Sequence, residues 1–552
     1  MPEGRNASLS HLLDSNFPPK EVEIPFVESR IRDLLDRISE LRKFEDELER
    51  HRSILSPVRK IPREVLGYIF AFLQPDEYDE KVRNARGRME LVNLSLVCKL
   101  WREAAFATHE LWTGLQIKPR HSPKSFKSVE AWLSRSGSLA RRLQYHGWYL
   151  ESDDPGTFDN LQMCRCGVQD AWPRQEPRPC LLAMSVMPHL LTNGPPLDHL
   201  TLMCNDTECF QHFMEAMDSL RAENVATRPR PWDTLKSLSI KFRDASLQTG
   251  GHLGQTFISR FERIPRVQSL EVHLPSQSTF EYEFDPSHLE LNILPNLIEN
   301  LTTFTICCPW AGPHLLNLLP HCRNVETLTI NFGNSGSALW GLEYHPLVRQ
   351  YSVSPLVLPK LVTLRIRMGY NVDLLRILKA PRLVNLDISM FPREATKEEH
   401  LVLPVTTFLE QSGCGPNLRS FRLHACCIDA EHLFFLLSSL PFLTNLTLDD
   451  VETSMHSLWK MFKNLDTNRG ADLSFSNLEK LEVLQVPPDY QLNAVVDYLK
   501  ARGPSLKFQF VASYKIQAPD VTMEKDIRQR LQFGNSGVQA SVVPSVRHMY
   551  YL

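Results

Sequence analysis

The sequence lacks the features that would tie it to a membrane or to nucleic acid. No apolar run reaches the roughly eighteen residues that a membrane-spanning helix needs, and residues 1–17 have no apolar signal-peptide core. Neither sign of charge dominates, since 61 Lys and Arg stand against 64 Asp and Glu, so we expect neither a nucleic-acid nor a membrane partner. Twelve cysteines in 552 residues are too sparse for a disulfide scaffold, which indicates reduced thiols and a cytoplasmic or nuclear location.

Catalytic motifs are also missing. The chain has only 23 glycines, and the loop that includes Gly333 lacks the Lys-Ser/Thr that completes a phosphate-binding loop. No Gly-x-Ser-x-Gly nucleophile elbow occurs. Cys164, Cys166, Cys180 and Cys204 lack the paired Cys-x-x-Cys spacing of a zinc site. The sequence therefore predicts no catalytic residue, no metal site and no cofactor, and indicates a protein that is not an enzyme.

A polar lead over residues 1–22 precedes an amphipathic helix expected over 23–56. Its apolar residues alternate in steps of four and three until Glu45 interrupts them, at Val27, Ile31, Leu34, Ile38, Leu41 and Leu48. We call this row the seam. It holds fewer than four clean heptads, so a helix that packs on its own chain is the expectation and a coiled-coil dimer is the alternative.

A small helical unit is expected over residues 57–118. Pro62 suits the first turn of a helix, and Val65, Ile69 and their neighbours then recur at helical spacing. A second apolar helical stretch runs from Leu91 to Ala105, and Leu111 with Trp112 closes the unit. Three short helices enclose little core, so some of these large apolar residues are expected to face a partner.

The order of these residues resembles an F-box. The resemblance rests on Ile61-Pro62-x-Glu64-Val65-Leu66-x-x-Ile69-Phe70-x-x-Leu73, then Leu94-x-x-Val97-Cys98-x-x-Trp101-Arg102, then Leu111-Trp112. Ile61 replaces the family's usual leucine, and the insert over residues 74–90 is longer than in the compact motif. The flanks also resemble a large fungal group of F-box proteins.

The resemblance implies a non-catalytic docking subunit. F-box proteins bind a Skp-type adaptor, which links them to a cullin and a RING subunit, and the conjugating enzyme of that assembly does the chemistry. By position in the motif, the expected adaptor-binding residues are Ile61, Pro62, Val65, Leu66, Ile69, Phe70, Leu73, Leu94, Val97, Cys98 and Trp101. The same residues also serve as the core of so small a unit, and Phe70 and Leu73 are the strongest candidates for core.

Residues 191–512 repeat one phrase: an apolar residue, two others, an apolar residue, one other, an apolar residue. Ten phrases begin at Leu197, Leu235, Val267, Leu301, Val325, Leu361, Leu383, Leu418, Leu443 and Leu478. The alternation at the end of each phrase predicts a short strand with one buried face, and helical stretches separate the phrases. The spacing varies from 22 residues, between Leu361 and Leu383, to 38 residues, between Leu197 and Leu235.

Strand and helix in regular succession predict a leucine-rich-repeat solenoid. The overall fold class expected is therefore mixed α/β, with a small all-α three-helix F-box followed by an irregular solenoid. An irregular bridge over residues 119–190 and a tail over 513–552 complete the organisation. A doubly wound α/β domain is the alternative fold, although such domains seldom repeat one phrase ten times.

The residues between the apolar positions of each phrase should line the exposed strand face, the natural place to hold a partner. In the C-terminal repeats the candidates for binding a protein substrate are Arg365, Arg367, Asp387, Arg419, Arg422, His424 and Asp449. Their arginines suit carboxylate or phosphate groups, and an ordinary solvated strand face is the alternative. The function expected is substrate recognition in a Skp–cullin–F-box ubiquitin ligase. A scaffold that acts outside ubiquitination, and a repeat protein whose F-box no longer docks, are the alternatives.

Overall fold

The computed structural model describes residues 20–54, 57–72, 86–117, 126–146, 180–204, 207–223, 229–242, 261–275, 291, 293–310, 313–333, 345–391, 400–469, 477–486, 498, 509–514 and 539–542. The chain divides into two compact units, Met1–Leu111 and Trp112–Leu552. The first is helical and the second combines a large parallel sheet with helices, so the chain is mixed α/β.

The first unit begins with the long helix α2, Ile24–Ile54, over the range where a helix was expected. The 3-10 turn η2 (Pro57–Lys60) and three short helices follow: α3 (Arg63–Phe72), α4 (Arg86–Val97) and α5 (Lys99–Ala107), with the turn η3 (His109–Trp112) after them. In the described part of the first unit the seam of α2 is not covered, because Ile31, Leu34, Ile38, Leu41 and Leu48 are all exposed.

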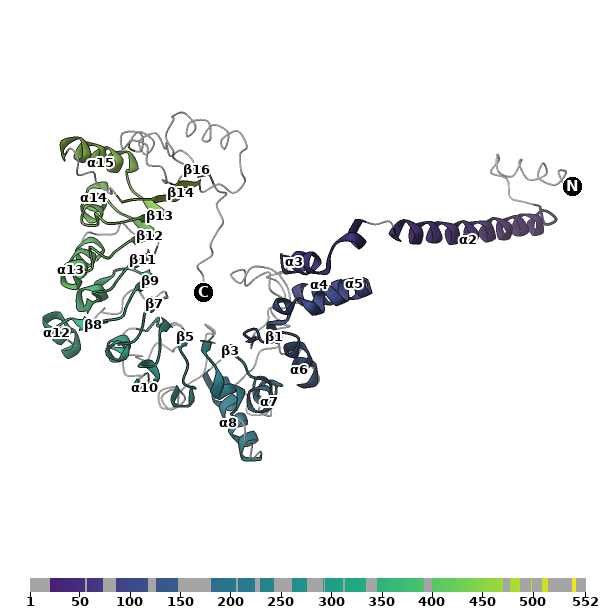
Figure 1. Ribbon diagram of the computed structural model, residues 1–552, viewed down its shortest axis with the longest axis horizontal. Coiled ribbons are helices and arrows are strands. Elements are labelled where there is room, and N and C mark those ends of the chain that lie inside the picture. The colour runs from purple at the N-terminus through teal and green to yellow at the C-terminus, as the bar shows by residue number, and fades with distance from the viewer. Residues whose placement is uncertain are drawn as a thin grey trace. The chain divides into compact units, whose positions relative to one another are not determined.

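The second unit contains one sheet of fourteen parallel strands among the described residues (Figure 1). Its strands are β1 (Gly114–Ile117), β2 (Arg142–His146), β3 (His199–Cys204), β4 (Ser237–Phe242), β5 (Ser269–His273), β6 (Thr303–Cys307), β7 (Thr327–Asn331), β9 (Thr363–Gly369), β11 (Asn385–Met390), β12 (Ser420–Cys427), β13 (Asn445–Glu452), β14 (Lys480–Val486), β15 (Gln509–Tyr514) and β16 (Gln539–Val542). They pair in the order of the sequence, without the reversal that defines a doubly wound sheet, so that alternative is wrong. A separate pair joins β8 (Leu356–Val357) and β10 (Leu378–Lys379).

Helical segments connect the strands and lie along one side of the sheet (Figure 1). The α-helices are α6 (Phe126–Ser134), α7 (Met187–Asn193), α8 (Thr207–Glu223), α10 (Pro295–Ile298), α11 (His314–Leu318), α12 (Pro346–Val353), α13 (Val402–Ser412), α14 (Ala430–Ser438) and α15 (Met455–Arg469). The 3-10 turns η6 (Pro231–Thr234), η7 (Phe261–Arg263), η10 (Leu319–His321) and η11 (Asp373–Ile377) replace or extend helices in several connections.

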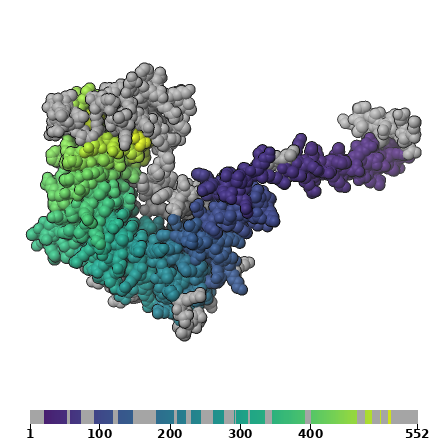
Figure 2. Space-filling view, in the orientation of Figure 1, coloured from purple at the N-terminus to yellow at the C-terminus, as the bar shows by residue number. Residues whose placement is uncertain are grey.

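The repeated phrase accounts for the core between sheet and helices. All three apolar positions of every phrase are buried, as the sequence predicted; Leu361, Leu364 and Ile366 are each 0% exposed. The phrases also stay in register, because Leu364 on β9 pairs with Leu328 on one side and Leu386 on the other. The result is a continuous apolar layer, and the space-filling view shows the second unit as a densely packed body (Figure 2).

The sheet extends beyond the range that the repeats predicted. Strand β1 lies within the range assigned to the F-box, and β2 with α6 lies in the bridge that was expected to be irregular. Two further strands, β15 and β16, continue the sheet past the last phrase and into the expected tail.

A residue with left-handed backbone recurs near the C-terminal end of four strands, β9, β12, β13 and β14. Met368, Ala425, Asp450 and Gln485 have φ between 54° and 56°, and each stands two residues after the last apolar position of its phrase. Such a conformation is uncommon outside glycine and costs about 1–2 kcal/mol per residue. Its recurrence at one position shows that these four strands share the same local irregularity near their C-terminal ends.

Candidate protein-interaction sites

Helix α3 packs one side of its surface inside the helical unit. Leu66 and Phe70, four residues apart, are each 2% exposed. The ring of Phe70 lies 5.1 Å from that of Trp101 on α5, measured between centroids. Leu66 therefore points into the three-helix core in this structure, and its expected role in adaptor binding stays a prediction.

The opposite side of α3 is apolar and exposed. Val65, Ile69 and Phe72 are 45%, 41% and 87% exposed, and they follow one another at i, i+4 and i+7 along one stripe of the helix. Tyr68 lies next to this stripe and is 67% exposed. Exposed apolar stripes of this kind are typical of protein-interaction surfaces.

Helix α4 contributes a second exposed apolar group. Val92, Leu96 and Val97 lie near its C-terminal end and are all exposed, while Leu91 on another side is buried. The chain leaves the helix at Cys98, whose backbone is extended, and α5 begins at the next residue. The continuous helical spacing seen in the sequence is thus divided into two helices.

Two side-chain contacts hold the junctions of this unit. Arg102 Nε of α5 donates to the carbonyl of Ser95 at 3.1 Å, which satisfies an orphan acceptor near the end of α4. Thr108 Oγ1, after α5, donates to the carbonyl of Ala104 at 2.8 Å. Gly67 of α3 is buried beside this threonine, and a Cβ at Gly67 would meet Thr108 Oγ1 at 2.1 Å. The close approach of α3 to the end of α5 therefore needs a glycine.

The structure distributes the predicted adaptor-binding residues over three environments. Pro62, Val65, Ile69, Val97 and Cys98 are exposed; Ile61, Leu94 and Trp101 are half-buried; Leu66 and Phe70 are buried; and Leu73 lies outside the described residues. Sequence reasoning missed five exposed apolar residues of the same helices: Tyr68, Phe72, Val92, Leu96 and Phe106. The i, i+4, i+7 spacing of Val65, Ile69 and Phe72 was the available signal.

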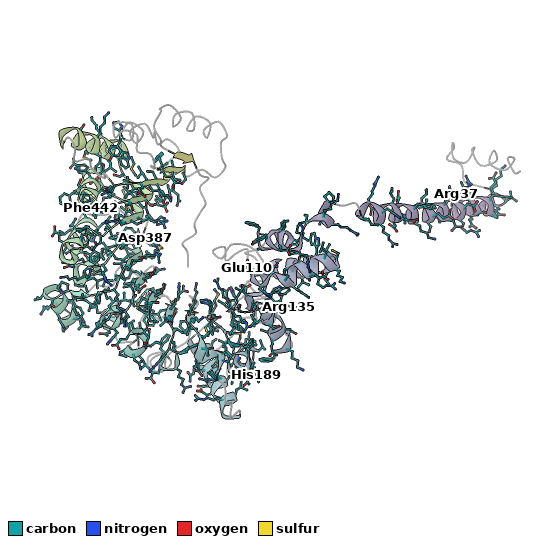
Figure 3. All side chains as sticks on the ribbon, in the orientation of Figure 1. Arg37, Glu110, Arg135, His189, Asp387 and Phe442 are labelled. Carbon is teal, nitrogen blue, oxygen red and sulfur yellow. The ribbon has the colours of Figure 1, made fainter. Side chains whose placement is uncertain are left out.

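The strand side of the second unit carries a row of ion pairs, with Asp387 on that side and Phe442 on the helical side (Figure 3). Arg367 on β9 donates to both carboxylate oxygens of Asp387 on β11, through Nη1 and Nη2, at 2.6 Å each. Arg422 on β12 donates through Nη2 to Asp449 on β13 at 2.6 Å, and its Nη1 lies 3.9 Å from Asp387. Positive and negative groups thus alternate across four strands.

The row ends on β14. Asp449 is 1% exposed and also accepts a hydrogen bond from Gln485 Nε2 at 3.0 Å. Thr447 donates to Glu482 at 2.7 Å, and Lys480 pairs with the same carboxylate at 2.7 Å. A buried carboxylate with two partners is a structural group. Asp449 therefore stabilises the row of ion pairs and is not part of a surface that a ligand can reach.

The remaining predicted substrate residues behave differently. Arg419 folds back on the loop before β12, where its Nη1 donates to the carbonyl of Pro416 at 2.6 Å, so it stands apart from the row. His424 lies within hydrogen-bond distance of Ser389, with 2.8 Å between Nδ1 and Oγ. Burial lowers the pKa of His424, and the charge of Arg422 lowers it further, so the ring is neutral near pH 7.

Arg365 is the arginine of this group that keeps its charge available. It lies on β9 between Thr329 of β7 and Asp387 of β11 in the strand register, and it is half-buried. Within the part of the chain that the structure describes, its guanidinium forms no hydrogen bond or ion pair. Arg367 and Arg422 pair with aspartates and Arg419 bonds to backbone carbonyls, so of these four arginines Arg365 is the one whose guanidinium has no such contact.

A second charged cluster lies on β4 and β5. His273 Nε2 lies 2.7 Å from Glu271 Oε1, and Lys241 Nζ lies 3.5 Å from the same oxygen. Burial alone would raise the pKa of Glu271, but the hydrogen bond with His273 and the charge of Lys241 outweigh it and lower the pKa to about 2. Glu271 is therefore ionised over the whole physiological range.

Neither metal ligation nor membrane insertion has support in the described residues. Among them, no three or more His, Cys, Asp or Glu side chains are grouped so as to hold a metal ion. Cys180 and Cys204 are buried and form no disulfide with a described residue, and Cys164 and Cys166 lie outside the described residues. None of the described helices is both long enough and apolar enough to cross a membrane.

Comparison with known families identifies the helical unit. Residues 58–118 match the model of the F-box-like family, over α3, α4 and α5. The chain therefore contains an F-box-like domain at the position that the sequence predicted. No curated protein matches the chain. Domains of this family generally bind Skp-type adaptors, and an F-box-like domain fits a substrate-recognition role in ligases of the Skp–cullin–F-box type.

Proposed function

We propose that this protein is a substrate-recognition subunit of a Skp–cullin–F-box ubiquitin ligase. The observation that carries the proposal is the exposed stripe of Val65, Ile69 and Phe72 on the F-box-like domain. Apolar anchors of this kind, with a polar rim, are what a helix-on-helix protein interface requires. We assign the stripe, together with Val92 and Leu96 of α4, to the Skp-type adaptor.

In this role the chain does no chemistry of its own. The cullin and RING subunits reached through the adaptor bring a conjugating enzyme, and the chain holds the substrate close to it. Proximity of this kind raises the effective concentration of a substrate lysine at the thioester. The protein is thus not an enzyme by itself, needs no cofactor, and acts in the cytoplasm or nucleus.

We further propose that the second unit is an irregular leucine-rich-repeat-type solenoid that holds a protein substrate on its strand face. Support comes from the parallel strands in chain order and from the buried phrase, which recurs in register on successive strands. The Arg365 guanidinium has no ion pair with a described residue. We therefore propose that it binds an acidic group of the substrate.

The adaptor assignment is tested by Ile69→Asp in the full chain. Ile69 is 41% exposed, so the charge should leave the domain folded while it removes an apolar anchor, and adaptor affinity should fall roughly thirtyfold or more. Lys99→Asp is the matched control, because the Lys99 side chain is 89% exposed and lies on α5. Adaptor binding by Ile69→Asp equal to that of the control would refute the assignment.

The substrate assignment is tested by Arg365→Ala, with Arg382→Ala as the matched control because Arg382 is exposed outside the strands. Proteins captured by the wild type and the control but not by Arg365→Ala would be candidate substrates. Such proteins should accumulate when the receptor is deleted. Captured proteins whose levels do not change would favour the scaffold alternative, and an unchanged set of captured proteins would move the substrate site away from Arg365.

A further inference from the structure

The exposed seam of α2 is the largest apolar feature of the described chain without an assigned partner. Ile31, Leu34, Ile38, Leu41 and Leu48 are between 43% and 62% exposed, and Figure 2 shows α2 as a rod. A solvated helix normally turns its polar residues outward, so a row of leucines and isoleucines in water is costly unless another surface covers it.

The length of α2 restricts what can cover it. With 31 residues it is about 46 Å long, whereas the F-box helices of 9 to 12 residues are about 14–18 Å long. A short helix can cover at most about two fifths of the length of α2. A second α2 matches the seam along its whole length and presents the same alternating steps of four and three, which is the spacing of knobs-into-holes packing.

The charges of α2 select the direction of such a pair. Residues 30–43 contain five basic and three acidic side chains, net +2, while residues 44–53 contain four acidic and two basic side chains, net −2. Two parallel helices would place like halves side by side. Two antiparallel helices place the basic half of one against the acidic half of the other, which is attractive along both halves.

Glu45 favours the same direction. It occupies a seam position, four residues after Leu41 and three residues before Leu48. In a parallel pair the two Glu45 carboxylates would face each other inside the apolar seam, where like charges are strongly unfavourable. In an antiparallel pair each Glu45 lies against the basic half of the partner helix.

We propose that two copies of this chain pair through α2 as an antiparallel coiled coil. The pairing is independent of the proposed ligase role, because it uses neither the α3 stripe nor the strand face. It makes the molecule a dimer that carries two F-box-like domains and two strand faces, one set attached to each C-terminal end of the α2 pair.

Light scattering on the full-length chain tests the pairing. The wild type should have twice the 63.5 kDa mass of one chain, and Ile38→Asp with Leu41→Asp should reduce it to one. Ser39→Asp with Glu40→Gln, at exposed positions off the seam, is the control; it leaves the net charge of residues 30–43 unchanged and should remain dimeric. A single-chain mass for the wild type, or a dimeric mass for the seam variant, would overturn the proposal. Adaptor binding should be unchanged in the seam variant, which separates this test from that of the ligase role.

Charge reversal tests the direction without touching the seam. Asp46, Glu47 and Glu49, each changed to Lys, should weaken the dimer at least tenfold, because the two halves then carry the same sign. Changing Arg30, Arg32 and Arg37 to Glu in the same chain makes the halves opposite again and should restore the dimer. Failure of the second set to restore it would overturn the antiparallel arrangement.

Discussion

Arg367 and Asp387 stand on neighbouring strands, twenty residues apart in the sequence, and are joined by two parallel hydrogen bonds of 2.6 Å. The pair is diagonal, because the register places Asp387 directly opposite Arg365, not Arg367. The diagonal contact of Arg367 therefore leaves Arg365 available, although Arg365 is the residue directly opposite Asp387 in the strand register. A partner with an acidic group meets Arg365 without having to displace a carboxylate of the chain.

The row of ion pairs should matter for stability. Asp449→Ala is expected to destabilise the second unit by about 3 kcal/mol, because it leaves the Arg422 guanidinium without its short contact in a half-buried setting. Glu479→Ala, an exposed carboxylate before β14, should change stability by less than about 0.5 kcal/mol. Denaturant unfolding of both variants is the measurement. Equal midpoints would show that the row contributes nothing.

Substitutions of two α3 residues should separate the stability of the F-box-like domain from its binding to the adaptor. Leu66→Ala removes a buried side chain and should cost the F-box-like domain about 2–5 kcal/mol. Ile69→Ala should cost less than about 1 kcal/mol in stability and should weaken the adaptor complex. Hydrogen exchange of α3 and α5, measured beside adaptor affinity, distinguishes the two effects. Faster exchange in Ile69→Ala than in Leu66→Ala would contradict the assignment of the two sides.

Gly67→Ala probes the approach of α3 to the end of α5. The new methyl would lie 2.1 Å from Thr108 Oγ1, so Thr108 must rotate and lose its hydrogen bond to Ala104, or the helices must separate. A loss of about 1–3 kcal/mol is expected. The double variant Gly67→Ala with Thr108→Ala should recover part of it in the same unfolding measurement, and no recovery would place the strain elsewhere.

The low pKa of Glu271 predicts that the stability of the protein decreases in acid. Because its folded pKa of about 2 lies below the ordinary value of 4.5, the carboxylate contributes stability that is complete above pH 4.5 and is lost as the pH falls toward 2. Glu271→Gln should therefore be less stable than wild type at neutral pH, and the difference should shrink between pH 4.5 and 2. Denaturant midpoints across this range measure it, and a difference that is constant with pH would contradict the depressed pKa.

Much of the sheet was predictable from one phrase. The buried positions followed from the alternation, since Leu364 and Ile366 can share one face of a strand only if Arg365 points to the other. The first two strands were not predicted although they carry the same signal. Trp112-x-x-Leu115-x-Ile117 and Ala140-x-x-Leu143-x-Tyr145 repeat the phrase before residues 191–512, the range assigned to the repeats.

The candidate sites were less predictable. The ion pairs depend on diagonal reach between strands, which no linear spacing specifies, so the neutralisation of Arg367 and Arg422 could not be read from the chain. On α3 the sequence is apolar on both sides, and periodicity alone does not say which side faces α5. The buried contact of Phe70 with Trp101 resolves this, and it depends on how three separate helices meet.

The order of the strands has a consequence for how the chain is made. Each strand of the large sheet hydrogen-bonds with strands that are its neighbours along the sequence, so a new strand can add to an existing edge as soon as it leaves the ribosome. Among the described strands of the large sheet, each pairs with the next one in the sheet's sequence order, so every addition closes one connection at a time. Synthesis and assembly of the second unit can thus advance together from β1, and a chain interrupted after β13 already holds a paired sheet whose last edge is ready for β14.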